Sequence, residues 1–213
     1  MSTTLSYILN RFQIDPTRVR SPIELPNFGR DDLATLFSEL GFKVGAEIGV
    51  EQGLYSEVLC KANPDMKLYG VDAWAAYKGY RDHSSQEKMD GFYQDAIDRL
   101  APYNCEIVRK FSIEASLDFP DKSLDFIYID ANHELYYVLD DLRAWPRKVK
   151  RGGIIAGHDY IESTRNDSRN HVVMAIDAFT HAYRIHPWFL LGRKHPLPGE
   201  IRDKTRSWMM VRS

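Results

Sequence analysis

The chain has 213 residues, a length that suits one domain with a sizeable core. Its 28 Lys and Arg residues nearly balance 30 Asp and Glu residues and 44% of the sequence is hydrophobic, so neither a nucleic acid nor a membrane is expected as partner. The sequence has no apolar run of membrane-spanning length and no paired cysteine spacing, which favours a cytoplasmic protein without a zinc site or a disulfide framework.

The first 40 residues carry two apolar patches, residues 5–12 and 33–40, with three prolines between them. We expect residues 1–40 to form a helical cap that packs on a single globular unit, residues 41–213. The cap could cover its own core or mediate a homodimer, and no residue decides between the two.

From residue 43 onward, short apolar runs alternate with longer amphipathic stretches, as in a parallel sheet with crossover helices. The predicted strands are residues 44–49, 67–72, 105–109, 124–130 and 153–158, and the predicted helices are residues 55–62, 86–100, 113–117, 134–149 and 172–186. Two further β-like segments, 188–191 and 207–211, predict an antiparallel hairpin at one edge. We therefore expect an α/β fold with a mostly parallel seven-stranded sheet and helices on both faces.

The first of these strands leads into a loop that contains Gly49 and Gly53 before the next helix begins. Glycines at a strand-to-helix turn allow the backbone to approach a ligand closely. The next strand ends in Asp72, whose carboxylate could accept hydrogen bonds from both hydroxyls of a ribose. The loop and the acid together predict an adenosine cofactor.

The details of this loop decide between adenosine cofactors. A dinucleotide fold calls for glycines spaced G-x-G-x-x-G and a free helix amino terminus, whereas Glu47 and Glu51 lie in this turn and would repel a pyrophosphate. A carboxylate such as Glu47 suits the ammonium group of a methionine moiety. A nicotinamide-dependent oxidoreductase is disfavoured accordingly.

At this point the sequence resembles the class I S-adenosylmethionine-dependent methyltransferases, whose first motif is an acidic residue followed by a Gly-x-x-x-Gly-like loop. The resemblance runs from about residue 44 to residue 160 and implies a Rossmann-like fold with S-adenosylmethionine as cofactor. It also implies cofactor contacts from Glu47, Gly49, Gly53 and Asp72, and from Ser112 beside the adenine. We expect the aromatic residues Trp74, Tyr77 and Tyr80 to pack in the core rather than to contact the adenine.

Polar side chains follow the next two strands, Asp130 and His133 after the first and His158 and Asp159 after the second. Open α/β sheets bind ligands at this edge. His133 and His158 are candidate bases for a hydroxyl acceptor, with Asp130 a third catalytic candidate that could also contact the cofactor. This arrangement resembles the metal-dependent O-methyltransferase branch, which implies Mg²⁺ on Asp130 and Asp159. His158 departs from that branch, because a carboxylate often stands there.

Other interpretations stay open at this edge. Asp159 could cap the following helix, and His133 could be a capping or solvent-facing imidazole. The expected acceptor is a hydroxyl of a small molecule, a sugar or a phenol, and no Asn/Asp-Pro-Pro-Tyr-like turn of nitrogen methylases follows Ile129. The alternatives are a non-catalytic cofactor-binding or scaffold protein and a methyltransferase that acts on nitrogen or on a macromolecule.

Overall fold

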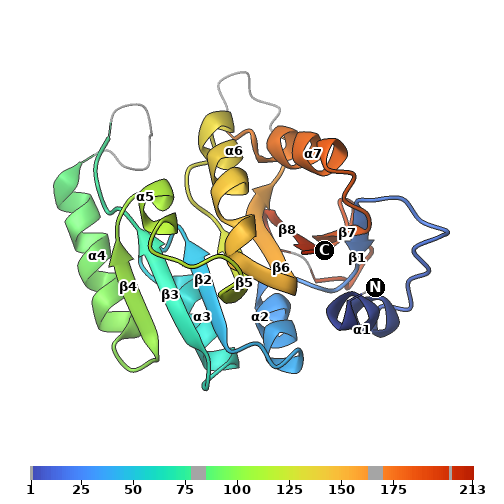
Figure 1. Cartoon of the computed structure of the whole chain (residues 1–213), viewed down its shortest axis with the longest axis horizontal. Helices are drawn as coiled ribbons and strands as arrows, with labels where there is room; N and C mark the ends of the chain where they lie inside the picture. Colours follow the sequence, from blue (N-terminus) through green and yellow to red (C-terminus); the bar gives the residue numbers. More distant parts are fainter. Residues whose placement is uncertain (1, 78–84, 163–169, 202) are drawn as a thin grey trace.

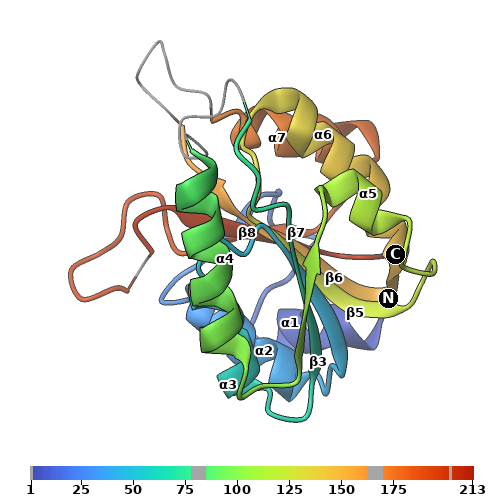
Figure 2. The same ribbon diagram turned by 90° about the vertical axis from the view of Figure 1, so that its left-hand side faces the viewer.

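The computed structural model describes residues 2–77, 85–162, 170–201 and 203–213. These residues form an eight-stranded sheet in the order β1-β7-β8-β6-β5-β2-β3-β4, with helices on both faces (Figures 1 and 2). The strands are β1 (Ile23–Leu25), β2 (Val44–Ile48), β3 (Lys67–Asp72), β4 (Cys105–Arg109), β5 (Leu124–Ile129), β6 (Val149–Tyr160), β7 (Trp188–Leu191) and β8 (Arg206–Val211).

Helices cover the two faces in separate groups. Helices α1, α2 and α3 lie on one face with α4 near the β4 edge, and α5, α6 and α7 lie on the other (Figures 1 and 2). Their bounds are α1 (Thr3–Arg11), α2 (Arg30–Glu39), α3 (Leu54–Ala62), α4 (Gln86–Leu100), α5 (Ser112–Ser116), α6 (Leu135–Ala144), the 3-10 turn η1 (Pro146–Lys148) and α7 (Val172–Ala182). Each face therefore has its own apolar core against the sheet.

The predicted mostly parallel α/β fold is confirmed, but the described residues form eight strands rather than seven. The additional strand, β1, has only three residues and lies between two proline-containing turns, so it gives no periodic signal in the sequence. It pairs in parallel with β7. The predicted antiparallel hairpin is β7 and β8, and β1 rather than the hairpin forms that edge.

The central strands are buried because helices cover both of their faces. Phe126 in β5 is fully buried and stacks on Phe37 of α2, with ring centroids 3.9 Å apart. Gly45 in β2 lies against the same ring, since a Cβ at Gly45 would stand 2.1 Å from a ring carbon of Phe126. The absence of a side chain at Gly45 thus leaves room for the Phe126 ring to pack on the backbone of β2.

Two helices end four or five residues earlier in the structure than predicted. Helix α6 ends at Ala144 instead of residue 149, because Pro146 has no N–H with which to continue the helical hydrogen bonds, and the chain goes on as the 3-10 turn η1. Helix α7 ends at Ala182 rather than residue 186. Strand β6 begins at Val149, earlier than predicted, and continues through Gly152 at a positive φ of 80° with a register shift against β5.

Among the residues that the structure describes, no helix combines the length and the apolar character needed to cross a bilayer.

Candidate functional site

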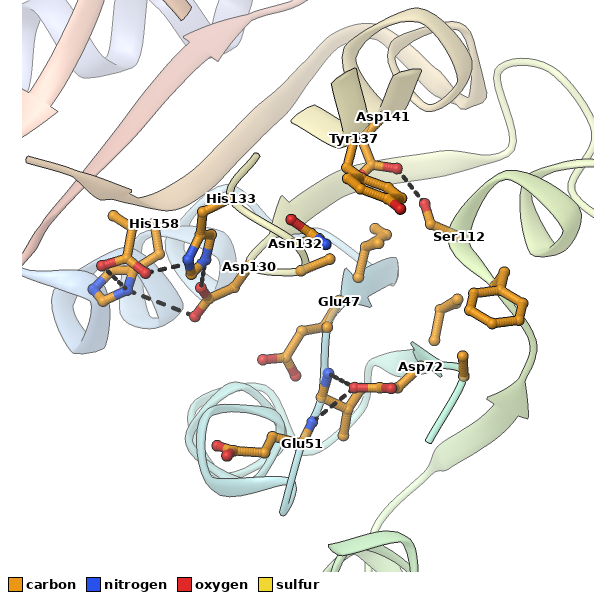
Figure 3. A pocket seen from close by; sticks show the side chains of 18 of the residues that line it. Glu47, Glu51, Asp72, Ser112, Asp130, Asn132, His133, Tyr137, Asp141 and His158 are labelled. Carbon is orange, nitrogen blue, oxygen red and sulfur yellow. Dashed lines mark hydrogen bonds and ion pairs between the residues drawn. The ribbon is translucent and has the colours of Figure 1, made fainter. Parts of the chain in front are cut away.

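A cavity of 710 Å³ opens at the carboxyl ends of the central strands. Five of the predicted cofactor-binding residues line it, namely Glu47, Gly49, Asp72, Ser112 and Asp130, as do the predicted chemical residues His133, His158 and Asp159. Gly53 is absent from this lining. The structure therefore brings side chains from four strand ends and the β4–α5 junction into one cavity (Figure 3).

The loop between β2 and α3 needs its two glycines for different reasons. Gly49 has φ of 93°, and a Cβ there would lie 2.2 Å from the backbone oxygen of Asp130. Gly53 has φ of 76° and begins α3 as its N-cap, with its N–H donated to the Val50 carbonyl at 2.9 Å. Gly49 thus permits close contact between two strand ends, and Gly53 permits the turn into the helix.

Asp72, the predicted ribose acid, also holds this loop in place. Its Oδ2 accepts hydrogen bonds from the backbone N–H groups of Val50 and Glu51, both at 3.0 Å (Figure 3). Its Oδ1 accepts from the N–H of Trp74 at 2.9 Å. The carboxylate therefore has a structural role in addition to its place in the cavity wall.

Glu47 lies at the floor of the cavity with only 1% of its surface exposed. Its Oε2 accepts a hydrogen bond from the Ser56 hydroxyl of α3. Burial raises the pKa of the Glu47 carboxyl well above its usual value, and the bond from Ser56 opposes this only in part. A cation that entered beside Glu47 would favour its ionised form.

Ser112, predicted to contact adenine, forms hydrogen bonds with two residues at helix α6 and its C-terminal end. Its hydroxyl donates to Asp141 and accepts from Trp145 Nε1 at 2.8 Å. Burial raises the pKa of Asp141 to about 7, partly offset by the Ser112 hydrogen bond. The sequence of α6 does not indicate that Asp141 is buried, because Asp141 follows another acidic residue and nothing in the local pattern distinguishes the two.

Aromatic rings form part of the wall near Ser112. Tyr77, expected to pack in the core, instead lines the cavity. It accepts a hydrogen bond from Asn132 at 2.9 Å, and its ring centroid lies 6.2 Å from that of Phe111. Trp74 is 1% exposed and packs in the core, as expected. Tyr80 lies outside the described residues.

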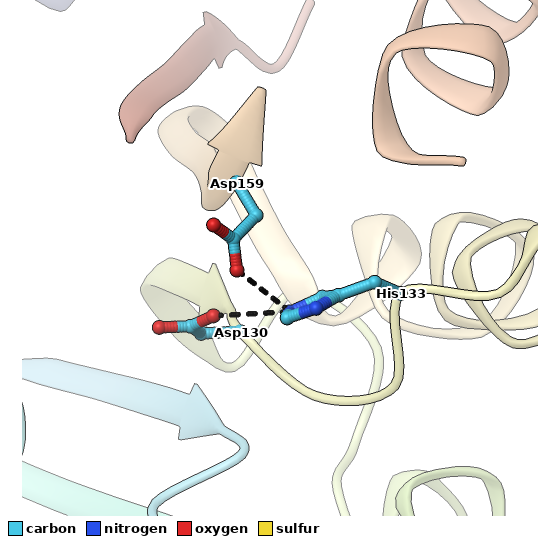
Figure 4. A group of neighbouring side chains, drawn as sticks. All are labelled: Asp130, His133 and Asp159. Carbon is cyan, nitrogen blue, oxygen red and sulfur yellow. Dashed lines mark hydrogen bonds and ion pairs between the residues drawn. The ribbon is translucent and has the colours of Figure 1, made fainter. Parts of the chain in front are cut away.

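The acidic and imidazole groups predicted at the chemical edge meet in one cluster. Nε2 of His133 lies 3.1 Å from Oδ2 of Asp159 and 3.4 Å from Oδ1 of Asp130 (Figure 4). His158 Nδ1 lies 3.6 Å from Asp130 Oδ2, and its ring also contacts the Thr205 hydroxyl. These four side chains come from β6 and from the residues directly after β5.

This cluster also meets the spatial requirement for a metal site. One ligand atom from each of Asp130, His133 and Asp159 lies within 4.8 Å of the others, and all three side chains are partly buried. Two carboxylates with an imidazole form a donor set compatible with a divalent cation. The residues therefore fit a metal, with His133 in addition to the two predicted acids.

The cavity lining includes residues outside the sequence motifs, among them one arginine and one tyrosine. Arg30, the first residue of α2, lines the cavity, and Tyr55 of α3 lines it beside Arg30. Arg30 precedes the glycine loop by an entire strand and helix, so no local spacing connects it with the site. Only the packing of α2 against α3 brings it there.

Comparison with known proteins gives a match between residues 46–160 and a family model described as a methyltransferase domain. This stretch contains the glycine loop, Asp72, and both strand ends of the Asp and His cluster. No curated protein matches the sequence.

Several solved structures resemble most or all of the chain. They include an S-adenosylmethionine-dependent methyltransferase from Aquifex aeolicus (19% identity, 98% of each chain, TM-score 0.57). An O-methyltransferase from Bacillus cereus in complex with S-adenosylhomocysteine (SAH) is 17% identical and has a TM-score of 0.56, covering 100% of this chain and 92% of that one. A precorrin-6y C5,15-methyltransferase from Geobacter metallireducens is 14% identical over 86% of this chain and 88% of its own, with a TM-score of 0.54. At these identities the likeness establishes the shared fold.

Proposed function

Because the chain belongs to the methyltransferase family, we propose that it transfers the methyl group of S-adenosylmethionine to a hydroxyl oxygen of a small molecule. The observation that carries the choice of oxygen is the cluster of His133 with Asp130 and Asp159 at the cavity edge. A hydroxyl acceptor needs a group that removes its proton, and an imidazole beside carboxylates is suited to that task.

The cavity offers a place for each part of the cofactor. Ser112 and Phe111 lie after β4 and would face the adenine, while Asp72 at the end of β3 would face the ribose. Glu47 and Gly49 belong to β2 and its loop and would face the methionine part. The sulfonium would then lie between this loop and Asp130, next to the His and Asp cluster.

Methyl transfer is an in-line displacement at the sulfonium carbon. A lone pair of the acceptor oxygen forms the new C–O bond as the C–S bond breaks, which leaves SAH, and the hydroxyl proton passes to an imidazole nitrogen. His133 is the first candidate for this base and His158 the second, since both line the cavity. Asp130 and Asp159 would stabilise the imidazolium that forms and keep the ring oriented.

A divalent cation is compatible with the same edge, where Asp130, Asp159 and His133 would hold it. When bound, such a cation would orient the acceptor hydroxyl and increase its acidity. His133 would then act as a ligand, and the role of base would pass to His158. The donor set admits Mg²⁺, although an imidazole ligand suits transition metals better.

The shared fold leaves the acceptor atom undecided, because one similar structure is named an O-methyltransferase and another a C5,15-methyltransferase. A panel assay tests the choice. Purified protein is incubated with S-adenosylmethionine and with separate pools of phenols, sugars, amines and carbon acids, and SAH and methylated products are measured by mass spectrometry. We expect turnover with a hydroxyl pool, reduced at least tenfold in His133→Ala or His158→Ala. Methylation confined to amines or carbon acids would contradict O-methylation.

A further inference from the structure

Acidic residues outnumber basic residues in the described lining of the cavity. Seven acidic residues line it, namely Glu47, Glu51, Asp72, Asp130, Asp140, Asp141 and Asp159, whereas Arg30 is the only Lys or Arg among the described lining residues. The methionine part of the proposed cofactor carries a carboxylate as well as an ammonium group. Transfer of a carboxylate into such an acidic site is unfavourable unless a cation meets it.

Two backbone hydrogen bonds and one aromatic contact hold Arg30 in position. Its backbone N–H donates to Asp203 at 2.8 Å, and its carbonyl accepts from the Tyr55 hydroxyl at 2.7 Å. Its guanidinium carbon lies over the Tyr55 ring, 5.1 Å from the centroid. The carboxylates of Asp130 and Asp203 attract this guanidinium electrostatically. In the described part of the chain neither they nor any other carboxylate forms a direct ion pair or hydrogen bond with it, so its hydrogen-bond donors can reach a ligand.

Contacts through Tyr55 place Arg30 above the centre of the sheet. The Tyr55 ring packs on Tyr128 of β5 with centroids 4.5 Å apart, and Tyr128 is the direct neighbour of Glu47 in the pairing of β5 with β2. Arg30 therefore stands over the strands that would face the methionine part. Asp72 and Ser112, which would face the ribose and adenine, lie farther along the sheet at the ends of β3 and β4.

We infer that Arg30 binds the methionine carboxylate of the cofactor, with its guanidinium plane held by Tyr55. This inference rests on the proposed function, since it requires that S-adenosylmethionine occupies the cavity. A planar guanidinium pairs with a carboxylate through two parallel N–H···O bonds, which a stacked ring pre-organises. Arg30 and Glu47 would then meet the two opposite charges on the same carbon of the ligand.

Calorimetry with two ligands tests this role. The ligands are SAH and its decarboxylated analogue, which keeps the ammonium group and lacks only the carboxylate. Each is titrated into the wild type, Arg30→Gln, Arg30→Lys and the control Arg151→Gln, which removes an exposed arginine. Thermal unfolding of the free proteins verifies that each variant is folded.

We expect the wild type and Arg151→Gln to bind SAH at least tenfold more tightly than the analogue, because a charged hydrogen-bonded pair is worth roughly that factor or more. Arg30→Gln should lose about 10- to 100-fold in SAH affinity, with little change for the analogue, and Arg30→Lys should lose less. An Arg30→Gln variant that keeps the preference for SAH, or loses both ligands equally, would overturn the inference and leave the proposed function intact. A wild type that binds neither ligand would contradict the proposed function itself.

Discussion

The carboxylate of Asp72 accepts a hydrogen bond from the backbone N–H of Val50 at 3.0 Å and so joins the end of β3 to the loop after β2. A second bond from Glu51 reaches the same oxygen. The acid that would meet the ribose is therefore also the acid that shapes the glycine loop. Under the proposed function, one side chain would therefore serve both cofactor binding and the stability of the loop.

Replacement of Asp72 by Ala should consequently destabilise the protein even without a ligand. Three backbone N–H groups lose their acceptor, and we expect a loss of about 2 kcal/mol or more in the free energy of unfolding. Urea unfolding of the free protein measures this, with Asp65→Ala, an exposed acid, as control. An unchanged unfolding free energy together with lost SAH binding would assign Asp72 to the ligand alone.

Glu47 should release a proton when the cofactor binds. Burial raises the pKa of this carboxyl in the free protein, and a ligand ammonium beside it would lower that pKa again. SAH titrations near neutral pH in buffers with different ionisation enthalpies count the protons. We expect net release by the wild type and none by Glu47→Gln, and equal proton counts in the two proteins would refute this role.

The buried carboxyl of Asp141 should make the stability of the folded protein depend on pH. Its pKa of about 7 lies above the value of 3.8 for a free Asp side chain, mainly because of burial, so the unfolded chain binds fewer protons between these two values. Asp141 therefore costs progressively more stability as the pH rises from about 4 to 7.

Asp141→Asn keeps the size of the side chain and removes this titration. Relative to the wild type, the variant should gain in melting temperature between pH 5 and pH 8. Asp140→Asn, which changes a half-exposed neighbour, should track the wild type much more closely. A pH-independent difference between Asp141→Asn and the wild type would disprove the assignment.

Divalent cations should stabilise the protein through the cluster at the cavity edge. We expect Mn²⁺ or Mg²⁺ to raise the melting temperature in the presence of SAH, and chelation with EDTA to reverse the shift, because two carboxylates and an imidazole converge there. Asp159→Asn should abolish the shift, whereas Asp118→Asn, an exposed acid elsewhere, should retain it. An equal shift in both variants would place the cation outside this cluster.

The sequence predicts the parts of this site that depend on local pattern. Gly49 and Asp72 follow from a strand-to-helix turn and a strand end, and Asp130 and Asp159 follow from two apolar strands whose carboxyl ends meet at one edge. Such residues can be located before any tertiary contact is known.

Features that depend on packing between distant segments cannot be predicted from local sequence patterns. Strand β1 has only three residues, and its pairing with β7 depends on a chain segment far along the sequence. Arg30 reaches the cavity through the packing of α2 on Tyr55, and Asp141 is buried where α6 packs against α5 and contacts Ser112. None of these three features produces a periodic pattern in the sequence.

The central claim, that the cavity binds S-adenosylmethionine, is tested most directly by calorimetric titration of the wild-type protein with SAH, with NAD⁺ titrated in parallel. The account predicts one SAH site per chain with micromolar affinity and no heat from NAD⁺. Heat from NAD⁺ alone, or from neither ligand, would contradict it.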